Sequence, residues 1–340
     1  MKKIFVAFLL ALFCLAMGTS AWAEVKFGAT TATRDIVLEE EDEEDAGEKP
    51  VGETPGGLGV EEMRKDDFTM SLKSDKPDGV YKIGEKITLT FKSDTDAYVT
   101  VLDFTPSGQI LVLFPNKWVE NNFVKAGEEI SIPAQGAKFS MKAGGPVGVD
   151  VIKAIATNND VPVFDKENND VAGPFSVIKD PKSATRDILL TEEDVDEEEE
   201  AAKAELKWSV ASLAVMTTDG SDAPTGFGVA AHGDATIKAW ANGTSFLVGE
   251  RVFVKILSDK GGKLVSLVDE APGKNTNNLL PENADIAFAP GEILILPRKE
   301  DKWKLVAAES VGVDTIKATV ELEDGTQLEL AFSINVENDE

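Results

Sequence analysis

The stretch Val147-Gly-Val-Asp-Val-Ile-Lys-Ala154 recurs as Val311-Gly-Val-Asp-Thr-Ile-Lys-Ala318, 164 residues further along the chain. Seven of the eight positions are identical. Self-similarity at a fixed offset within one chain indicates an internal repeat. Apolar and polar residues alternate in both copies, which is typical of a strand that packs on a core. The pair therefore predicts one β-module made twice.

The similarity extends on both sides of this stretch. Ile83-Gly-Glu-Lys86 matches Val248-Gly-Glu-Arg251 at an offset of 165. Upstream, Ala32-Thr-Arg-Asp-Ile-Val-Leu38 recurs as Ala184-Thr-Arg-Asp-Ile-Leu-Leu190, at an offset of only 152. The repeated unit is thus predicted to be an acidic leader followed by a body. The second copy is expected to carry an insert of 13 residues, the difference between the two offsets, within residues 207–228.

Short alternating runs bounded by turn residues make up both bodies, and helical periodicity is absent from them. This spacing of strands predicts an all-β fold of two tandem β-sandwich domains, Ig-like or related, joined by acidic linkers. The expected divisions are a signal peptide at 1–23, an acidic flexible leader at 24–65, a first β-sandwich module at 66–180, an acidic linker at 181–205 and a second module at 206–340.

The N-terminus has the features of a secretory signal peptide. Lys2 and Lys3 precede an apolar run over residues 4–17, and Ala21-Trp22-Ala23 forms a small-x-small cleavage site before Glu24. We expect a periplasmic or extracellular protein with no membrane insertion after signal removal. Cys14 is the sole cysteine and lies within the signal, which excludes disulfides and thiol chemistry from the mature chain.

Negative charge dominates the sequence. Removal of Lys2 and Lys3 leaves 32 basic and 61 acidic residues, a net charge of −29. Such a surface repels phosphate backbones and anionic lipids, so nucleic acid is excluded as a partner. Residues 39–45 are all acidic, and eight of the nine residues at 192–200 are acidic. Runs of this kind are usually solvated spacers, with weak divalent cation binding or binding of a basic partner as the alternatives.

The sequence offers little catalytic chemistry. His232 is the one histidine, too few for a zinc site, and neither a nucleophile elbow nor a phosphate-binding loop is present. We therefore predict no catalytic residues, no metal site and no cofactor. A pair of carboxylates that converge in the fold stays open as an alternative.

The candidate binding residues are Phe114, Pro115, Asn116 and Trp118. A strand that stops at a proline and continues into an amide and an aromatic exposes a loop of the kind that binds partners. The alternative is a plain turn at a strand end, with Trp118 packed on the rim of the sandwich.

The first body resembles the bacterial domain of unknown function numbered 4384. The resemblance is carried by Tyr81-Lys-Ile-Gly-Glu-Lys-Ile87, Leu113-Phe-Pro-Asn116 and Gly148-Val-Asp-Val-Ile-Lys-Ala-Ile155, and it is weaker in the second body. It implies an accessory β-domain of exported or multidomain bacterial proteins, with no established catalytic residues. We expect a non-enzymatic envelope protein whose modules bind or scaffold an envelope protein or a polysaccharide. The alternatives are a secreted, carboxylate-dependent, carbohydrate-active hydrolase and a calcium-responsive acidic spacer.

Overall fold

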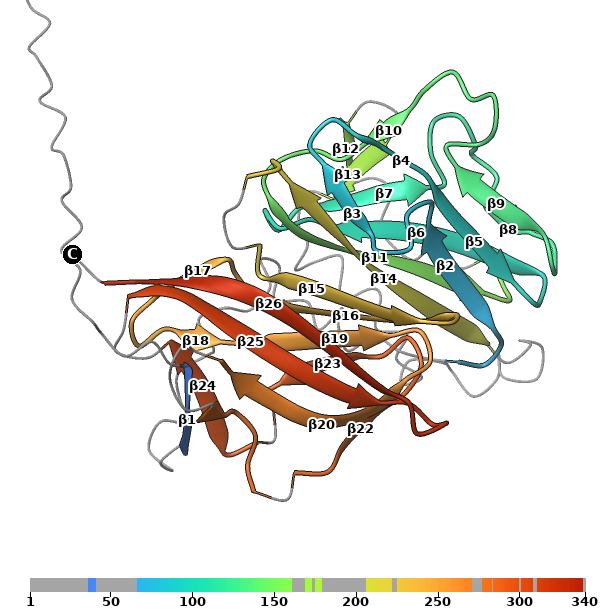
Figure 1. Cartoon of the computed structure of the whole chain (residues 1–340). Coiled ribbons are helices and arrows are strands. Elements are labelled where there is room, and N and C mark those ends of the chain that lie inside the picture. Colours follow the sequence, from blue (N-terminus) through green and yellow to red (C-terminus); the bar gives the residue numbers. More distant parts are fainter. Residues whose placement is uncertain are drawn as a thin grey trace, which may run out of the picture. The chain divides into compact units, whose positions relative to one another are not determined.

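The computed structural model describes residues 36–40, 66–160, 169–172, 175–178, 206–221, 225–270, 277–282, 284–299, 301–307 and 311–338. Every regular element among these residues is a β-strand (Figure 1). The fold is all-β, with sandwich-like sheets, as the alternating sequence pattern predicts. The predicted signal peptide and its predicted cleavage-site residues Ala21, Ala23 and Glu24 lie outside the described part of the chain.

The first module contains one large sheet, one small sheet and a short two-stranded ribbon. The large sheet has the order β12-β13-β7-β6-β11-β14-β3 with β8 beside β6, the small sheet is β2-β5-β9, and the ribbon is β10-β4. The strand bounds are β2 Met70–Ser74, β3 Val80–Lys82, β4 Lys86–Ile87, β5 Leu89–Ser93, β6 Ala97–Phe104, β7 Ile110–Phe114, β8 Phe123–Val124, β9 Glu129–Ile132, β10 Met141–Lys142, β11 Gly148–Thr157, β12 Asn169–Ala172, β13 Phe175–Ile178 and β14 Trp208–Thr218.

The core of the first module lies between its large and small sheets. On β5, Leu89, Phe91 and Ser93 point inward while Lys92 is exposed, as a period of two requires. The buried apolar residues of this core include Val99, Val101 and Ala154 from the large sheet and Ile132 from the small one. The repeated strand β11 is buried over most of its length. Packing in the core therefore explains the apolar residues of this repeated strand.

The second module has the same three parts. They are a sheet of order β17-β26-β25-β20-β21 with β22 beside β20, a sheet β15-β16-β19-β23, and a three-stranded ribbon β1-β24-β18. The bounds are β1 Ile36–Glu40, β15 Phe227–His232, β16 Ala235–Ala241, β17 Ser245–Leu247, β18 Arg251–Val252, β19 Val254–Ser258, β20 Gly262–Asp269, β21 Asn277–Asn278, β22 Ile286–Phe288, β23 Ile293–Leu296, β24 Trp303–Ala307, β25 Gly312–Glu321 and β26 Gln327–Glu337.

The pairings of the first module recur in the second at the offsets found in the sequence. β5 and β19, and likewise β6 and β20, have bounds that differ by 165, while β11 and β25 differ by 164. β11 lies between β6 and β14, and β25 lies between β20 and β26. β14 then pairs in parallel with β3, as β26 does with β17. The two modules thus share their strand arrangement.

β14 belongs to the sheet of the first module. The sequence analysis instead predicts that the second module begins at residue 206, before β14. β14 pairs with β11 over ten positions, from Gly148↔Thr217 to Thr157↔Trp208. The region expected to be an insert at the start of the second module therefore supplies the strand that corresponds to β26. In the first module residues 158–207, which include the acidic stretch at 181–205, separate the neighbouring strands β11 and β14 along the chain, whereas a short turn joins β25 to β26.

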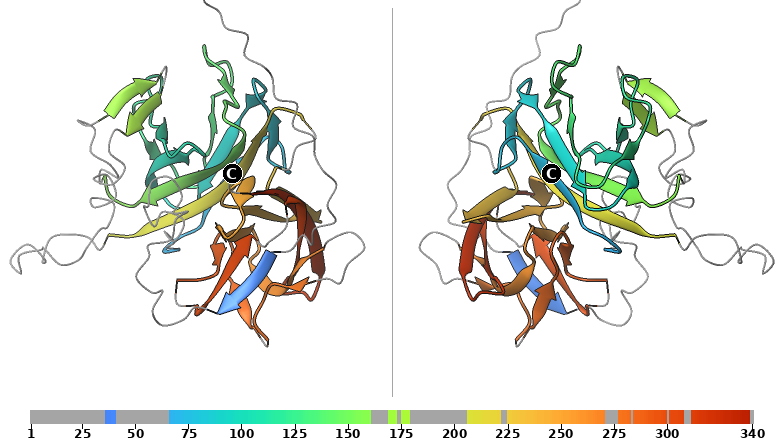
Figure 2. Two further views of the ribbon diagram at one scale, coloured as in Figure 1. Left: turned by 90° about the vertical axis from the view of Figure 1, so that its left-hand side faces the viewer. Right: turned by 90° about the vertical axis from the view of Figure 1, so that its right-hand side faces the viewer.

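A strand from the first leader lies in the second module. β1 pairs antiparallel with β24, with Ile36 opposite Ala307 and Glu40 opposite Trp303 (Figures 1 and 2). β24 is thereby paired on both sides, by β1 and by β18. The leader was expected to be flexible over the whole of residues 24–65, and the structure corrects this for Ile36–Glu40, because the open edge of β24 offers the leader backbone hydrogen-bonding partners.

A further apolar cluster joins strands of the two modules. Val151, Ala214 and Met216 pack with Phe227, Trp240 and Leu257. Beside it the Lys238 ammonium, on β16, donates a hydrogen bond to the Ala214 carbonyl oxygen at 2.8 Å. Desolvation by burial lowers the Lys238 pKa to about 8, against partial opposition from Asp78 and Asp259. The two modules therefore contact each other directly.

Candidate recognition surface

The predicted binding residues Phe114, Pro115, Asn116 and Trp118 occupy one loop but do different things. Phe114 ends β7 and is 2 % exposed. Its ring lies 5.1 Å from that of Phe91, centroid to centroid, inside the core. Pro115 then takes the chain out of the sheet, since it has no N–H to give to the ladder. Phe114 and Pro115 therefore anchor the loop.

Asn116 organises the turn that follows. Its Nδ2 donates to the Leu113 carbonyl oxygen at 2.9 Å, and its Oδ1 accepts from the backbone N–H groups of Trp118 and Val119 at 2.9 and 3.1 Å. The backbone of Asn116 also exchanges two hydrogen bonds with Val119. Because both ends of the buried amide are engaged within the turn, Asn116 supports the alternative interpretation as a structural residue.

Trp118 is the most exposed of the four, at 51 %, while Pro115 is only partly exposed. Its indole stacks on the Phe139 ring, with centroids 6.2 Å apart and planes at 12°. The Lys117 ammonium lies 5.7 Å from the centroid of the indole. The result is an aromatic pair with one cation beside it, which we call the Trp118 platform (Lys117, Trp118 and Phe139). Flat aromatic surfaces of this kind are common at binding sites.

Phe139 was not among the residues predicted from the sequence. It precedes the two-residue strand β10, and nothing in its local pattern distinguishes it from other apolar residues. One signal was available, because at an offset of 164 it corresponds to Trp303, so both copies have an aromatic there.

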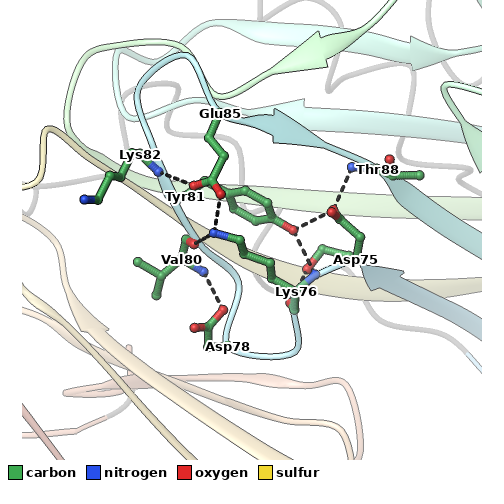
Figure 3. Close-up of polar contacts among 9 residues, drawn as sticks. Asp75, Lys76, Asp78, Val80, Tyr81, Lys82, Glu85 and Thr88 are labelled. Atoms are coloured by element: carbon green, nitrogen blue, oxygen red, sulfur yellow. Dashed lines mark hydrogen bonds and ion pairs between the residues drawn. The ribbon is translucent and has the colours of Figure 1, made fainter.

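A polar network ties the loop between β2 and β3 to the turn between β3 and β4 (Figure 3). The Tyr81 hydroxyl donates to Asp75 Oδ1 at 2.8 Å and accepts from the Lys76 N–H at 3.1 Å, while Asp75 Oδ1 also accepts from the Thr88 N–H. Lys76 forms an ion pair with Glu85 at 2.6 Å. Burial of the ring raises the Tyr81 pKa to about 12, so the phenol stays protonated. Every contact serves the fold of the turn.

Two acidic side chains are buried in the first module. Asp103 on β6 lies opposite Ile152, and Asp150 precedes Ile152 by two residues on β11, so both carboxyls occupy one face of the sheet. Asp103 Oδ1 has no hydrogen-bond partner within the described residues, and Asp150 Oδ2 accepts from the Thr217 hydroxyl at 3.4 Å. Burial raises the Asp103 pKa well above its ordinary value, and the nearby Asp150 raises it further. Burial also raises the Asp150 pKa to about 7.

Residues 80–160 match the family model described as "Domain of unknown function (DUF4384)". The first module contains a DUF4384 domain. The matched range holds the Trp118 platform, both buried acids and Tyr81, but neither β2 nor β14, which complete the sheets around it. No curated protein sequence matches the chain.

Three solved structures are similar to the chain at low identity. Salmonella alpha-2-macroglobulin reacted with methylamine is 13 % identical with a TM-score of 0.21, covering 80 % of this chain and 16 % of its own. Fibronectin(III)-like modules of Clostridium thermocellum CbhA are 11 % identical with a TM-score of 0.20, covering 79 % and 95 %. The native conformation of E. coli alpha-2-macroglobulin is 12 % identical with a TM-score of 0.21, covering 81 % and 17 %. The chain thus spans under a fifth of the two macroglobulins, and at these scores the likenesses carry no argument about function.

Beyond the DUF4384 domain, the described residues hold few groups with chemistry of their own. His232 ends β15 and is exposed. Within the described residues no group of three or more His, Cys, Asp or Glu side chains could hold a metal ion. In the same part of the chain no helix is long and apolar enough to cross a membrane. The long acidic runs fall almost wholly outside the described residues, so cation binding there stays a prediction.

Proposed function

We propose that the chain is an exported, non-enzymatic protein of the bacterial envelope that binds another macromolecule through the Trp118 platform. Export rests on the signal peptide of residues 1–23. The partner is an envelope protein or polysaccharide, since the net charge argues against nucleic acid and anionic membrane surfaces. The protein acts in the periplasm or outside the cell.

We also propose that the two modules arose by duplication of one unit. The strand-for-strand agreement between them supports this, as do paired details of the ribbons. Ala143 N–H donates to the Glu85 carbonyl oxygen and Ala143 accepts from Gly84 N–H, and Ala307 makes the same two bonds with Glu250 and Gly249. Glu85 Oε2 and Glu250 Oε2 each accept a backbone N–H three residues earlier, at 3.0 and 2.9 Å.

The exposure of Trp118 is the observation that carries the binding proposal. A tryptophan is usually buried or partly covered, because its apolar area is costly to hydrate. Here the ring is held flat against Phe139, and the Asn116 turn fixes the backbone beneath it. A preformed aromatic surface loses little conformational entropy when a partner covers it.

Pull-down from envelope fractions with the purified mature chain tests this proposal. The Trp118→Ala variant should lose at least tenfold of the captured partner. The matched control is Val265→Ala, which removes an exposed apolar residue from the second module (45 % exposed) and should capture as much as the unmodified chain. Equal capture by all three proteins would refute the Trp118 platform as the binding surface.

A carboxylate-dependent hydrolase is the second candidate, and the raised pKa values of Asp103 and Asp150 favour it. Both residues, however, are only partly exposed, and they share a sheet face with the core residue Ile152, which argues against access by a bulky glycan. Hydrolysis of envelope polysaccharide that disappears in both Asp103→Asn and Asp150→Asn, with the fold retained, would establish this candidate in place of the first.

A further inference from the structure

Two lysines lie directly opposite each other on the ribbon that β4 and β10 form in the first module. Lys142 is the Cα partner of Lys86, and the neighbouring pair is Met141 and Ile87. Ile87 and Met141 pack on the core of the module. Because side chains alternate along a strand, Lys86 and Lys142 point to the outer face, and both are exposed. Directly opposed residues have Cα atoms about 4.5–5.5 Å apart, so the two positive charges leave the ribbon side by side.

The fold of the ribbon does not require this pair of cations. Like charges directly opposite each other weaken the pairing of two strands. The ribbon of the second module has the same register without that repulsion, because Arg251 is the Cα partner of Val306. At the offsets of 165 and 164 these residues correspond to Lys86 and Lys142. The second cation of the first module therefore lowers stability, and a local arrangement of this kind is typical of a functional site.

The Trp118 platform is a short distance along the chain from this ribbon. Phe139 precedes Lys142 by three residues, so their Cα atoms are at most about 11 Å apart. The Trp118 indole stacks on the Phe139 ring, and Lys117 lies beside the indole. Lys138 is next to Phe139 in the chain, and both Lys117 and Lys138 are exposed. The aromatic pair is thus accompanied by four exposed lysines, which we call the platform cations (Lys86, Lys117, Lys138 and Lys142).

The charge of this region is opposite to that of the chain as a whole. Residues 130–149 contain two lysines and no acid, in a chain with 61 acidic residues out of 340. The carboxylate of Glu85 is already engaged, since Oε1 pairs with the Lys76 ammonium at 2.6 Å and Oε2 accepts from the Lys82 N–H at 3.0 Å (Figure 3). The loop between β7 and β8 is balanced, with one lysine and one acid, Glu120. The platform cations therefore attract negative charge locally, on a chain that repels it elsewhere.

We propose that the Trp118 platform and the platform cations bind a polysaccharide that carries carboxylates, of the kind built from uronic acid units. The C–H face of a pyranose ring is flat and apolar and stacks on an aromatic ring. The carboxylate at the edge of such a sugar accepts charge-assisted hydrogen bonds from an ammonium group. This inference rests on the proposed binding function and names the class of the partner.

An acidic segment of a protein is the competing partner. Proteins recognise peptides through a strand edge, a groove or a set of pockets for alternate side chains. The Trp118 platform is instead a flat pair of rings, with 12° between their planes, and the platform cations lie on the segments around it. A flat ring with a charge at its edge matches this arrangement better than a peptide does.

The test compares polygalacturonate with the same polymer after methyl esterification, because the ester keeps the pyranose backbone and removes the charge. Isothermal titration with the purified mature chain measures both affinities. The acidic polymer should bind at least roughly tenfold more tightly than the ester. Raising the salt from about 0.01 M to about 1 M shortens the Debye length from about 30 Å to about 3 Å and should remove most of this difference.

Two variants with the same change of charge locate the site. Lys86→Gln with Lys142→Gln should lose roughly tenfold of the affinity for polygalacturonate. Lys92→Gln with Lys125→Gln is the matched control, since it removes two exposed lysines elsewhere in the first module, and it should bind as the unmodified chain does. The first variant should also keep or raise the thermal midpoint, because it removes a like-charge pair from the ribbon.

Four results would overturn the inference. They are no binding of polygalacturonate, equal affinity for the acidic polymer and its ester, an equal loss in the control variant, and a lower thermal midpoint in Lys86→Gln with Lys142→Gln, which would make these lysines structural. Capture of an envelope protein that depends on Trp118, without binding of polygalacturonate, would leave the proposed function standing and replace the polysaccharide by a protein partner. Equal capture by Trp118→Ala would instead remove the proposed function itself.

Discussion

At the scale of single residues, the side chains of the candidate site divide by what they contact. Asn116 is 9 % exposed and its amide is fully engaged in its turn, whereas Trp118 is half exposed and contacts Phe139 and Lys117. Mutations at these two neighbouring positions should therefore separate stability from binding.

Replacement of Asn116 by alanine should destabilise the chain by about 1–3 kcal/mol, because the buried groups it satisfies lose their partners. Trp118→Ala should change the free energy of unfolding by much less. Urea denaturation of the two variants measures both effects. Asn116→Asp, which sets a carboxylate oxygen against the Leu113 carbonyl oxygen, should cost at least as much as Asn116→Ala. A Trp118→Ala cost as large as that of Asn116→Ala would contradict this division.

The buried carboxyl of Asp150 should make stability depend on pH. Its pKa rises from 3.8 to about 7 on folding, so the folded chain binds more protons between these values. Stability from this group is therefore present below pH 4 and is lost as the pH rises toward 7. Asp150→Asn, which stays neutral, should match the unmodified chain near pH 3, below both pKa values, and exceed it in stability at pH 8.

The size of that difference should be on the order of 1–4 kcal/mol, since each tenfold change in proton affinity is worth about 1.4 kcal/mol. Denaturant unfolding at the two pH values measures it. Asp160→Asn, at an exposed position, is the control and should show no such difference. A variant less stable than the unmodified chain at pH 8 would mean that the ionised carboxylate stabilises the fold.

At the scale of elements, local sequence patterns predict the strands in which apolar and polar residues alternate. They do not reveal to which sheet a strand belongs when its pairing partner lies far away in the sequence. β6 Ala97–Phe104 and β9 Glu129–Ile132 are short runs with recurring apolar residues, of the kind that the sequence analysis predicts as strands. The sequence analysis predicts an apolar insert where β14 lies, because the offset between the two copies changes from 152 in the leader to 165 in the body. β14 belongs to the sheet of the first module because it pairs with β11 across the acidic stretch. Pairing over such a sequence distance cannot be recognised from the residues of β14 alone.

The position of β14 leads to a prediction about fragments. A fragment of residues 24–221 should unfold in one cooperative transition, because it contains β14. A fragment that ends at residue 205 lacks the ten pairings of β14 with β11 and should not. Thermal circular dichroism of both fragments measures this, and equal cooperativity would place β14 outside the folding unit of the first module.

At the scale of the whole molecule, the sequence predicts one β-module made twice. In the structure β5, β6 and β11 have counterparts in β19, β20 and β25 at offsets of 164 and 165, while β12, β13 and β15 have none, and the duplication stays a proposal. The contribution of β1 to the second module was not foreseen, since a run of charge following an apolar segment is typical of a solvated linker. Of the two aromatic residues in the candidate site, the sequence analysis predicts only one. Trp118 came from its place after a strand end, but Phe139 meets it only in the folded chain.

The central claim, that the exported protein binds an envelope macromolecule through the Trp118 platform, is tested most directly in living cells. A photo-crosslinking amino acid placed at position 118 reports what contacts that surface, and the same residue at position 265 serves as the control, because Val265 is exposed in the second module. The account predicts a discrete adduct from position 118 in the envelope fraction and none from position 265. No adduct at position 118, or the same adducts from both positions, would contradict it.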